Sequence, residues 1–252
     1  MRLRRIKNLC VHVCHSCTSN CRGCNHLSPW HFRDPWRLDA KDLSRDLGRI
    51  RDMGTRVREL HLLGGEPGMH EKLDSCIWAC KGFPAQLWLK SNGMIPFPDK
   101  VWAALRDSGF KVQITNYGLA PQRVARLKSQ SQRYGVPLRI GRPGRWHLRF
   151  QTQDFGDAHR DQAFRDCDYG PYKYLQGGKL YRCSIDAYGE PYFKTLGLKW
   201  VDMGVSIHRP QSFDSFAKPS PNCRICRTAS ERVVGNLWRR ITREEVKKGI
   251  NS

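Results

Sequence analysis

The alternation of strand-like and helix-like segments is the feature that most limits what this chain of 252 residues can fold into. Short apolar runs predict strands, and apolar residues at three- and four-residue steps predict the helices between them. The predicted strands are residues 9–13, 57–63, 86–90, 111–115 and 136–140, and the predicted helices begin near Asp39, Leu73, Val101 and Pro121. Strand, helix and strand in this order are typical of parallel βαβ units. We therefore expect an α/β fold built on a parallel sheet.

Polar and glycine-rich segments follow the first four predicted strands. These segments are Cys17 to Cys24, Gly64-Gly65-Glu66-Pro67, Ser91-Asn92-Gly93 and Asn116-Tyr117-Gly118. Parallel α/β folds bind ligands in the loops at the carboxyl ends of their strands. We therefore expect one site built from these segments. For the asparagines, ordinary turn formation is the alternative.

The three cysteines of Cys17-Thr-Ser-Asn-Cys21-Arg-Gly-Cys24 predict a metal centre. A 4Fe–4S cluster normally takes four thiolates, so three leave one iron open to a small molecule. Zinc is the alternative, although zinc sites usually use two cysteine pairs. A disulfide framework is disfavoured because a chain of this length can bury its own core and no secretory signal is visible. No stretch approaches the roughly 20 apolar residues of a membrane span, so we expect a reducing, cytoplasmic compartment and no membrane partner.

The Cys-x3-Cys-x2-Cys spacing after a first strand, with Gly-Gly-Glu-Pro after the second, resembles the radical S-adenosylmethionine (radical SAM) superfamily. The resemblance implies a 4Fe–4S cluster on Cys17, Cys21 and Cys24 whose open iron binds SAM. Reductive cleavage of SAM then gives a 5′-deoxyadenosyl radical that abstracts a substrate hydrogen. An external one-electron donor, similar to flavodoxin or ferredoxin, is implied as well.

The same resemblance implies which residues contact SAM, with Glu66 accepting a hydrogen bond from its amino group. The implied cofactor-binding residues are Gly64, Gly65, Glu66, Pro67, Ser91, Asn92 and Asn116. One position departs from the family, because the residue before the third cysteine is often aromatic and here is Gly23. His26 and Trp30 are the alternatives for stacking on adenine. No catalytic side chain is assigned.

The strand and helix alternation ends near residue 141, and four cysteines lie beyond it: Cys167, Cys183, Cys223 and Cys226. A hairpin with a Gly177-Gly178 turn is predicted over residues 174–181. This spacing resembles the twitch extension of some radical SAM enzymes, which implies a second, auxiliary 4Fe–4S cluster on the four thiolates. Structural zinc on the same residues is the alternative. The remaining cysteines, Cys10, Cys14, Cys76 and Cys80, are expected to be buried core thiols.

These expectations combine into an α/β chain with two parts. Residues 1–150 are expected to form a partial (β/α)6-type parallel barrel of the radical SAM kind. Residues 151–252 are expected to form a small twitch-like extension of β-hairpin and helix that carries the auxiliary cluster.

The chain is strongly basic, with 44 Lys and Arg against 23 Asp and Glu, a net charge of +21. Such a charge favours polyanionic partners. Arg139, Arg142, Arg145 and Arg149 interleave with Trp146 and Phe150, a mixture suited to nucleic-acid backbones and bases. The first substrate hypothesis is therefore a nucleic-acid base or nucleotide, for example a hypermodified DNA base.

Three other interpretations of the basic chain stay open. The twitch resemblance favours modification of a ribosomally made peptide by epimerisation, cross-linking or dehydrogenation. A non-catalytic, cluster-bearing nucleic-acid binder is disfavoured, because it gives the open iron no use. The positive charge could also belong to an ordinary solvated surface.

Overall fold

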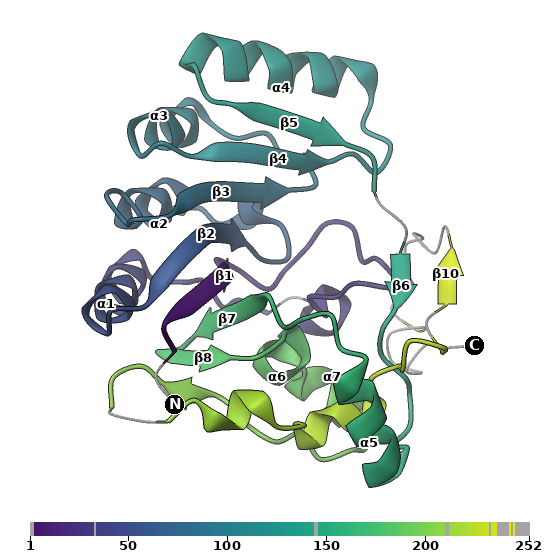
Figure 1. Cartoon of the computed structure of the whole chain (residues 1–252). Coiled ribbons are helices and arrows are strands. Elements are labelled where there is room, and N and C mark those ends of the chain that lie inside the picture. Colours follow the sequence, from purple (N-terminus) through teal and green to yellow (C-terminus); the bar gives the residue numbers. More distant parts are fainter. Residues whose placement is uncertain are drawn as a thin grey trace. The chain divides into compact units, whose positions relative to one another are not determined.

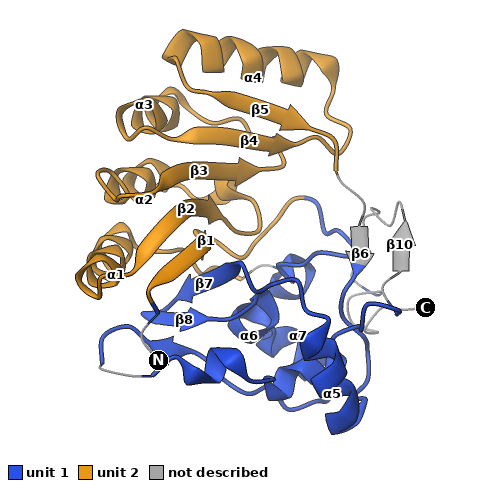
Figure 2. Ribbon diagram, viewed as in Figure 1, with its two compact units in different colours: residues 1–3, 19–32, 144–252 blue, residues 4–18, 33–143 orange. Residues whose placement is uncertain are grey.

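The structure is a computed structural model of the chain, and it describes residues 3–32, 34–143, 146–209, 212–231 and 233–235, with Thr242 and Glu244. The chain divides into two compact units, coloured separately in Figure 2. The parallel unit comprises residues 4–18 and 33–143, and the C-terminal unit comprises residues 1–3, 19–32 and 144–252. The division thus falls inside the first cysteine motif, between Thr18 and Ser19.

The parallel unit is a sheet of five parallel strands in the order β5-β4-β3-β2-β1, with a helix in each connection (Figure 1). Its strands are β1 (Arg5–His12), β2 (Arg56–Leu63), β3 (Gln86–Ser91), β4 (Lys111–Thr115) and β5 (Leu138–Gly141). Its helices are α1 (Ala40–Asp52), the short 3-10 helix η2 (Pro67–Met69), α2 (Leu73–Ala79), α3 (Asp99–Asp107) and α4 (Pro121–Tyr134). The predicted α/β fold with a parallel sheet is confirmed.

The apolar periodicity of these segments accounts for the packing of the sheet against its helices. Alternate strand residues such as Leu60, Leu62 and Leu89 are fully buried, as are Ile50 of α1 and Leu105 of α3. Helix α1 begins where predicted, because the Asp39 carboxylate accepts a hydrogen bond from the Lys41 backbone nitrogen at 2.7 Å. The core of this unit therefore consists of aliphatic side chains together with aromatic ones such as Phe97, Trp102 and Phe110.

Strand alternation places polar side chains on the opposite face of the same sheet. In register across β2, β3 and β4 lie His61, Trp88 and Lys111. The Lys111 ammonium lies over the Trp88 ring, 5.4 Å from its centroid, which is close enough for a cation–π interaction. His61 is 2% exposed, and its Nε2 lies 2.9 Å from the Glu59 carboxylate. This face is thus polar although part of it is buried.

The C-terminal unit contains an antiparallel set of strands in the order β7-β8-β9. These are β7 (Tyr172–Gln176), β8 (Lys179–Tyr181) and β9 (Val205–Ser206). The β7–β8 pair is the predicted hairpin, with Tyr174 opposite Tyr181. Gly177 and Gly178 form its turn with φ values of 55° and 69°, a left-handed conformation that favours glycine.

The described part of this unit also contains short helices. They are η1 (Ser28–His31), α5 (Gly156–Arg165), α6 (Ser184–Tyr188), α7 (Glu190–Thr195), η3 (Asp214–Ala217) and η4 (Pro221–Ile225). Leu27, Ile185, Tyr192, Phe193 and Ile225 form a buried cluster together with Cys183. The hydrophobic core of the unit therefore contains one of its cysteines.

Two segments differ from the sequence-based expectation. The polar stretch 151–166, which shows no clear period, contains α5, whose only buried residue is Ala163, so its apolar signal is weak. The sequence of residues 233–248, with basic residues in its second half, predicts a helix, but its start is a strand, β10 (Val233–Gly235), which pairs antiparallel with β6 (Trp146–Leu148). β-branched valines favour strands. The remainder of that predicted helix lies outside the described residues, apart from Thr242 and Glu244.

Within the part of the chain that the structure describes, no helix has the length and apolar character needed to cross a bilayer.

Candidate functional site

Gly64 and Gly65 bring the loop after β2 against the loop after β1. A Cβ atom on Gly64 would lie 2.3 Å from the Cys14 carbonyl oxygen, and one on Gly65 would lie 1.9 Å from the Ser16 carbonyl oxygen. The Gly65 nitrogen donates to the Cys14 carbonyl at 2.9 Å, and the Glu66 nitrogen to the Ser16 carbonyl at 2.8 Å. Only glycine permits this approach. The glycine pair therefore holds the Gly-Gly-Glu-Pro segment directly beside the residue that precedes Cys17.

Glu66 extends its carboxylate into the interior of the parallel unit, where it is 0% exposed. Its Oε1 accepts hydrogen bonds from the Ser91 hydroxyl at 2.5 Å and the Gly68 nitrogen at 3.2 Å. Its Oε2 accepts one from the Asn92 nitrogen at 2.8 Å. Burial raises the pKa of this carboxyl group, and the three donors oppose that shift. Glu66 thus connects the loop after β2 to the end of β3.

Asn92 continues this network to the first cysteine. Its side-chain nitrogen donates to the Thr18 hydroxyl at 3.1 Å and lies 3.7 Å from the Cys17 sulfur. Its side-chain oxygen accepts from the Met94 nitrogen at 2.8 Å. Segments at the carboxyl ends of β1, β2 and β3 are therefore joined by hydrogen bonds.

Pro67 and Asn116 have more local surroundings. Pro67 is buried at the start of η2. The Asn116 side-chain oxygen accepts from the nitrogens of Gly118 at 2.9 Å and Leu119 at 2.7 Å, which closes the turn after β4. Asn116 therefore makes the turn contacts that were its alternative interpretation, and the structure describes no side-chain bond from it to Glu66, Ser91 or Asn92.

The other two cysteines of the first motif belong to the C-terminal unit. The Cys24 nitrogen donates to the Cys21 carbonyl at 3.2 Å, and the Leu27 nitrogen to the Cys24 carbonyl at 3.1 Å, so the segment is a series of tight turns. Gly23 and Cys24 line a hollow of about 280 Å³ with Trp30 on its wall. Trp30 packs edge-on against Tyr192, with ring centroids 4.6 Å apart. Of the two aromatic candidates, Trp30 lines the hollow at Gly23, whereas His26 lies near Tyr174.

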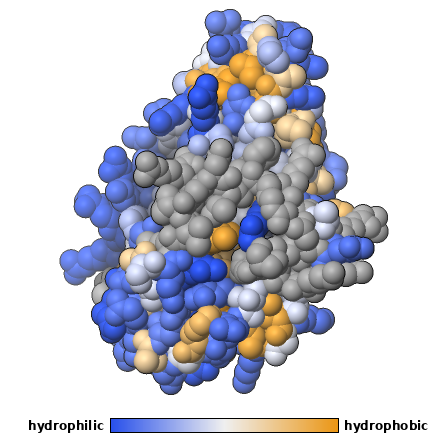
Figure 3. All heavy atoms as spheres, turned by 90° about the vertical axis from the view of Figure 1, so that its right-hand side faces the viewer, coloured by the Kyte–Doolittle hydropathy of each residue, from blue (hydrophilic) through white to orange (hydrophobic). Residues whose placement is uncertain are grey.

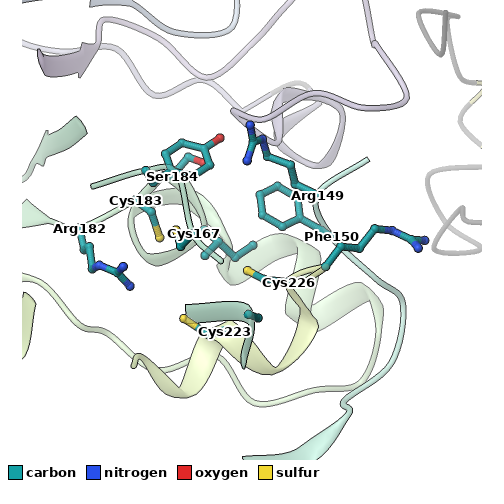
Figure 4. A pocket seen from close by; sticks show the side chains of 12 residues that line it. Arg149, Phe150, Cys167, Arg182, Cys183, Ser184, Cys223 and Cys226 are labelled. Atoms are coloured by element: carbon teal, nitrogen blue, oxygen red, sulfur yellow. The ribbon is translucent and has the colours of Figure 1, made fainter. Parts of the chain in front are cut away.

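The four distal cysteines meet around one hollow. Cys167, Cys183, Cys223 and Cys226 all line a space of about 440 Å³ within the C-terminal unit, and their side chains reach into it (Figure 4). They come from separate elements, since Cys167 follows α5, Cys183 precedes α6, and the last two lie at η4. The structure thus assembles the predicted set of four thiols although 59 positions separate Cys167 from Cys226.

Burial and neighbouring groups shift the pKa values of the cysteines in this hollow. Burial raises the pKa of the Cys183 thiol well above its usual range, and the charges of Asp186, Cys223 and Cys167 add to the effect. A hydrogen bond with Cys226 lowers the pKa of Cys223. Arg149, Arg182 and Arg227 are the cationic side chains among the lining residues. Because a thiol must lose its proton to bind a metal, proton release at Cys183 would accompany metal binding in this hollow.

Sequence reasoning missed a buried polar group beside these cysteines. Asp186 of α6 is 1% exposed, and its Oδ1 accepts hydrogen bonds from the Ser220 hydroxyl at 2.7 Å and the Asn222 amide at 2.8 Å. The only signal in the sequence is its position three residues after Cys183, which identifies no partner.

Only some arginines of the basic segment 139–150 are exposed and could contact a nucleic acid. Arg139 and Arg142 are exposed, and Arg145 lies outside the described residues. Arg149 is largely buried, forms a two-bond ion pair with Asp168 at 2.5 and 2.8 Å, and lies over the Tyr169 ring. Its charge is therefore already balanced within the protein. Hydrophilic residues predominate on the part of the surface that Figure 3 colours.

The remaining cysteines behave as core residues. Cys10, Cys14, Cys76 and Cys80 are buried, as expected, and all eleven cysteines of the chain are free of disulfides. Burial raises the pKa of Cys14 to about 11 and of Cys76 to about 12. Their thiols donate to backbone carbonyls, Cys14 to Glu66 and Cys76 to Leu38.

Comparison with known proteins supports both the fold and the first cysteine motif. A sequence-family profile described as a 4Fe-4S single cluster domain matches residues 5–77. A search of curated protein sequences finds no match. The crystal structure of BtrN in complex with AdoMet and 2-DOIA is similar with a TM-score of 0.52 and 15% sequence identity, over 97% of this chain and 88% of BtrN. The likeness to BtrN shows the fold.

Two further solved structures are more distant. SuiB of Streptococcus suis bound to S-adenosylmethionine has a TM-score of 0.45 and 13% identity, over 84% of this chain and 65% of SuiB. Native anSMEcpe with bound AdoMet and the Cp18Cys peptide has a TM-score of 0.40 and 14% identity, over 53% of this chain and 42% of that one. The matched region thus spans less than two thirds of the length of SuiB and less than two thirds of the length of anSMEcpe.

Proposed function

We propose that this protein, which has the fold and the 4Fe–4S domain of the radical SAM superfamily, is an enzyme that binds SAM at a cluster held by Cys17, Cys21 and Cys24. Residues 1–150 would carry this chemistry. Residues 151–252 would carry an auxiliary 4Fe–4S cluster on Cys167, Cys183, Cys223 and Cys226.

One observation carries the proposal. Asn92 bonds to Glu66 through its backbone and to Thr18 through its side chain, which also lies beside Cys17. The cysteine, Gly-Gly-Glu-Pro and Ser-Asn-Gly segments therefore share one hydrogen-bond network at the carboxyl edge of a parallel sheet, where such folds bind ligands. Core packing alone does not require these polar residues at this place.

The residues of this network have different roles. A 4Fe–4S cluster held by Cys17, Cys21 and Cys24 would supply one-electron reduction of SAM, with the electron coming from an external donor. The Asn92 amide donates toward the Cys17 sulfur, which stabilises a thiolate ligand. Gly64 and Gly65 keep backbone groups close to the cysteine loop, and Glu66 fixes the end of β3. Ser91, Asn92 and the segment around Pro67 then form the wall for SAM, with Asn116 at its margin.

The first test is the metal content of anaerobically reconstituted protein. We expect about eight irons per chain, four for each cluster, and about four after Cys17, Cys21 and Cys24 are all changed to Ala. Cys80→Ala is the matched control, because that buried thiol donates only to the Cys76 carbonyl and its loss leaves the iron content unchanged. Wild-type protein with no iron at the first motif would refute the proposal. Zinc at the second site would refute only the auxiliary iron–sulfur cluster.

The second test is turnover of SAM. With dithionite and SAM, the wild-type protein is expected to release 5′-deoxyadenosine slowly even without substrate. Glu66→Ala removes an acceptor for three donors, so SAM binding should weaken while iron is retained. Full 5′-deoxyadenosine release by Cys24→Ala protein would exclude the assigned cluster.

For the substrate, the proposal favours a nucleic-acid base or nucleotide on the basis of the +21 charge. Arg139 and Arg142 are the exposed arginines of the basic segment. Changing both to Glu should weaken duplex or single-strand binding and lower the slope of log affinity against log salt by about two units. Arg51 and Arg126, exposed on α1 and α4, provide a control pair of equal charge.

An equal loss of binding in the two double variants would mean that the overall charge, and no particular surface, attracts the polymer. If wild-type protein shows no binding at low salt, the polymer substrate is wrong, and free nucleotides and peptides are the next candidates.

A further inference from the structure

A buried carboxylate lies between the elements that carry the distal cysteines. Asp186 stands on α6, which begins directly after Cys183. Its Oδ1 accepts hydrogen bonds from Ser220 and Asn222, at 2.7 and 2.8 Å. These partners come immediately before Cys223 in the chain. One carboxylate thus contacts the residues on both sides of the four-cysteine hollow.

The partners of Asp186 are themselves fixed by other bonds. The Ser220 hydroxyl accepts a hydrogen bond from the Asn222 nitrogen at 3.1 Å, which caps the start of η4. The Asn222 amide donates to the Val201 carbonyl at 2.8 Å and accepts from the Val201 nitrogen at 3.0 Å. All three side chains are nearly inaccessible to solvent. The segment that presents Cys223 and Cys226 is therefore held in place without any contribution from the thiols.

A purely structural role accounts poorly for this carboxylate. A buried charged group costs stability unless its hydrogen bonds compensate, and an apolar side chain would pack beside Ile185 and Tyr188 without that cost. What an apolar side chain cannot do is set a fixed distance between α6 and η4. Directional bonds can, because their lengths and angles are narrowly constrained.

We propose that Asp186 is a positioning residue for the second metal site, which holds Cys183 at the correct distance from Cys223 and Cys226 before the metal binds. This inference rests on the proposed function of the four cysteines as ligands. Asp186 acts through the cysteines and is not itself a ligand.

The experiment measures the metal content of a parent variant that carries Cys17→Ala, Cys21→Ala and Cys24→Ala. In this parent variant only the second site can bind iron. Adding Asp186→Ala should reduce the remaining iron from about four per chain to below about one, because the two halves of the site lose their connection. Asp186→Asn keeps an oxygen acceptor for Ser220 and Asn222. It should therefore retain the iron, with an altered electron paramagnetic resonance signal because a charge beside Cys183 is lost.

Asp46 provides the matched control, since it is a buried aspartate on α1 of the parallel unit. Asp46→Ala should leave the iron at the second site unchanged. If Asp186→Ala protein does not fold, Ser220→Ala removes one of the two bonds and should cause an intermediate loss of iron.

The inference would be overturned if Asp186→Ala protein kept its full iron content and the parent's electron paramagnetic resonance signal. If Asp186→Ala protein is insoluble, the same result in both Ser220→Ala and Asp186→Asn proteins would overturn it. Failure of the proposed function looks different. If the second site of the parent protein binds zinc, zinc content replaces iron as the measurement. If that site binds no metal, the assignment of the four cysteines fails, and this inference fails with it.

Discussion

The parallel unit and the C-terminal unit bring their cysteines and polar partners together in different ways. In the parallel unit the candidate site follows from strand order, because the segments after β1, β2 and β3 are neighbours as soon as those strands pair. In the C-terminal unit Cys167 follows α5, Cys183 precedes α6, and Cys223 and Cys226 lie at η4. Side-chain bonds from Asp186 join α6 to η4.

The difference concerns where each unit obtains its stability. The parallel unit has a core of aliphatic and aromatic side chains between sheet and helices, including Leu60, Leu62 and Trp102. Both units bury cysteines, but the buried cluster of the C-terminal unit includes Cys183, a proposed metal ligand, and its helices α6 and α7 have five and six residues. Helices this short are unstable by themselves. We infer that the C-terminal unit would depend for its folding on the metal proposed at its four cysteines, whereas the parallel unit would not.

Metal removal is expected to give the largest difference between the two units. Binding of structural zinc contributes on the order of 10 kcal/mol to the folding of zinc-finger peptides, and a cluster on four thiolates should stabilise folding in the same direction. Anaerobic treatment with an iron chelator should therefore expose residues 151–231 to trypsin within minutes, while residues 34–143 stay protected. Mass spectrometry of the fragments measures this. Equal protection of the two segments after complete iron loss would show that the metal does not stabilise the C-terminal unit.

Substitution of Gly65 tests whether the candidate site in the parallel unit needs the close contact between the backbones of Gly65 and Ser16. A Cβ atom there would lie 1.9 Å from the Ser16 carbonyl oxygen, so Gly65→Ala should destabilise the protein by about 1–3 kcal/mol and weaken cluster retention. A Cβ atom on Gly48 in α1 would have no neighbour within 4 Å, so Gly48→Ala should stabilise by about 0.5–1 kcal/mol. Urea unfolding gives both values. Similar effects of the two substitutions would contradict the close approach.

The polar face of the parallel sheet yields the smallest predicted effect, a dependence of stability on pH. Burial and the charge of Lys90 lower the pKa of His61 to about 4 from its ordinary 6.5, against the opposing effect of Glu59. Because the folded pKa lies below the unfolded one, the contribution of neutral His61 is fully present above about pH 6.5 and is lost as the pH falls toward about 4. The free energy of unfolding should therefore fall by about 1–2 kcal/mol between about pH 7 and pH 5.

His61→Gln is the control for this titration, because glutamine retains a donor for Glu59 and has no charge to gain. Its free energy of unfolding should change less over the same pH range than that of the wild type, as measured by urea unfolding at both pH values. A pH dependence identical in the two proteins would mean that His61 does not titrate as described.

The sequence alone determined the alternation of strands and helices, the three cysteines after the first strand and the glycine pair after the second. These features are local, since a run of apolar residues or a cysteine spacing can be recognised without knowing what it contacts. The hairpin over residues 174–181 was predicted for the same reason, from its two-glycine turn. The short helix α5 escaped prediction because Ala163 is its only buried residue.

Only the tertiary structure decided which partners these residues meet. Glu66 bonds to Ser91 and Asn92, which lie 25 and 26 positions further along the chain, and Asp186 bonds to Ser220 and Asn222 at separations of 34 and 36. The tertiary structure also pairs Arg149 with Asp168, so the Arg149 charge is not free on the basic surface. A hydrogen bond requires both partners within about 3 Å in a defined direction, and for residues so distant in sequence only the packing of the whole unit sets that geometry.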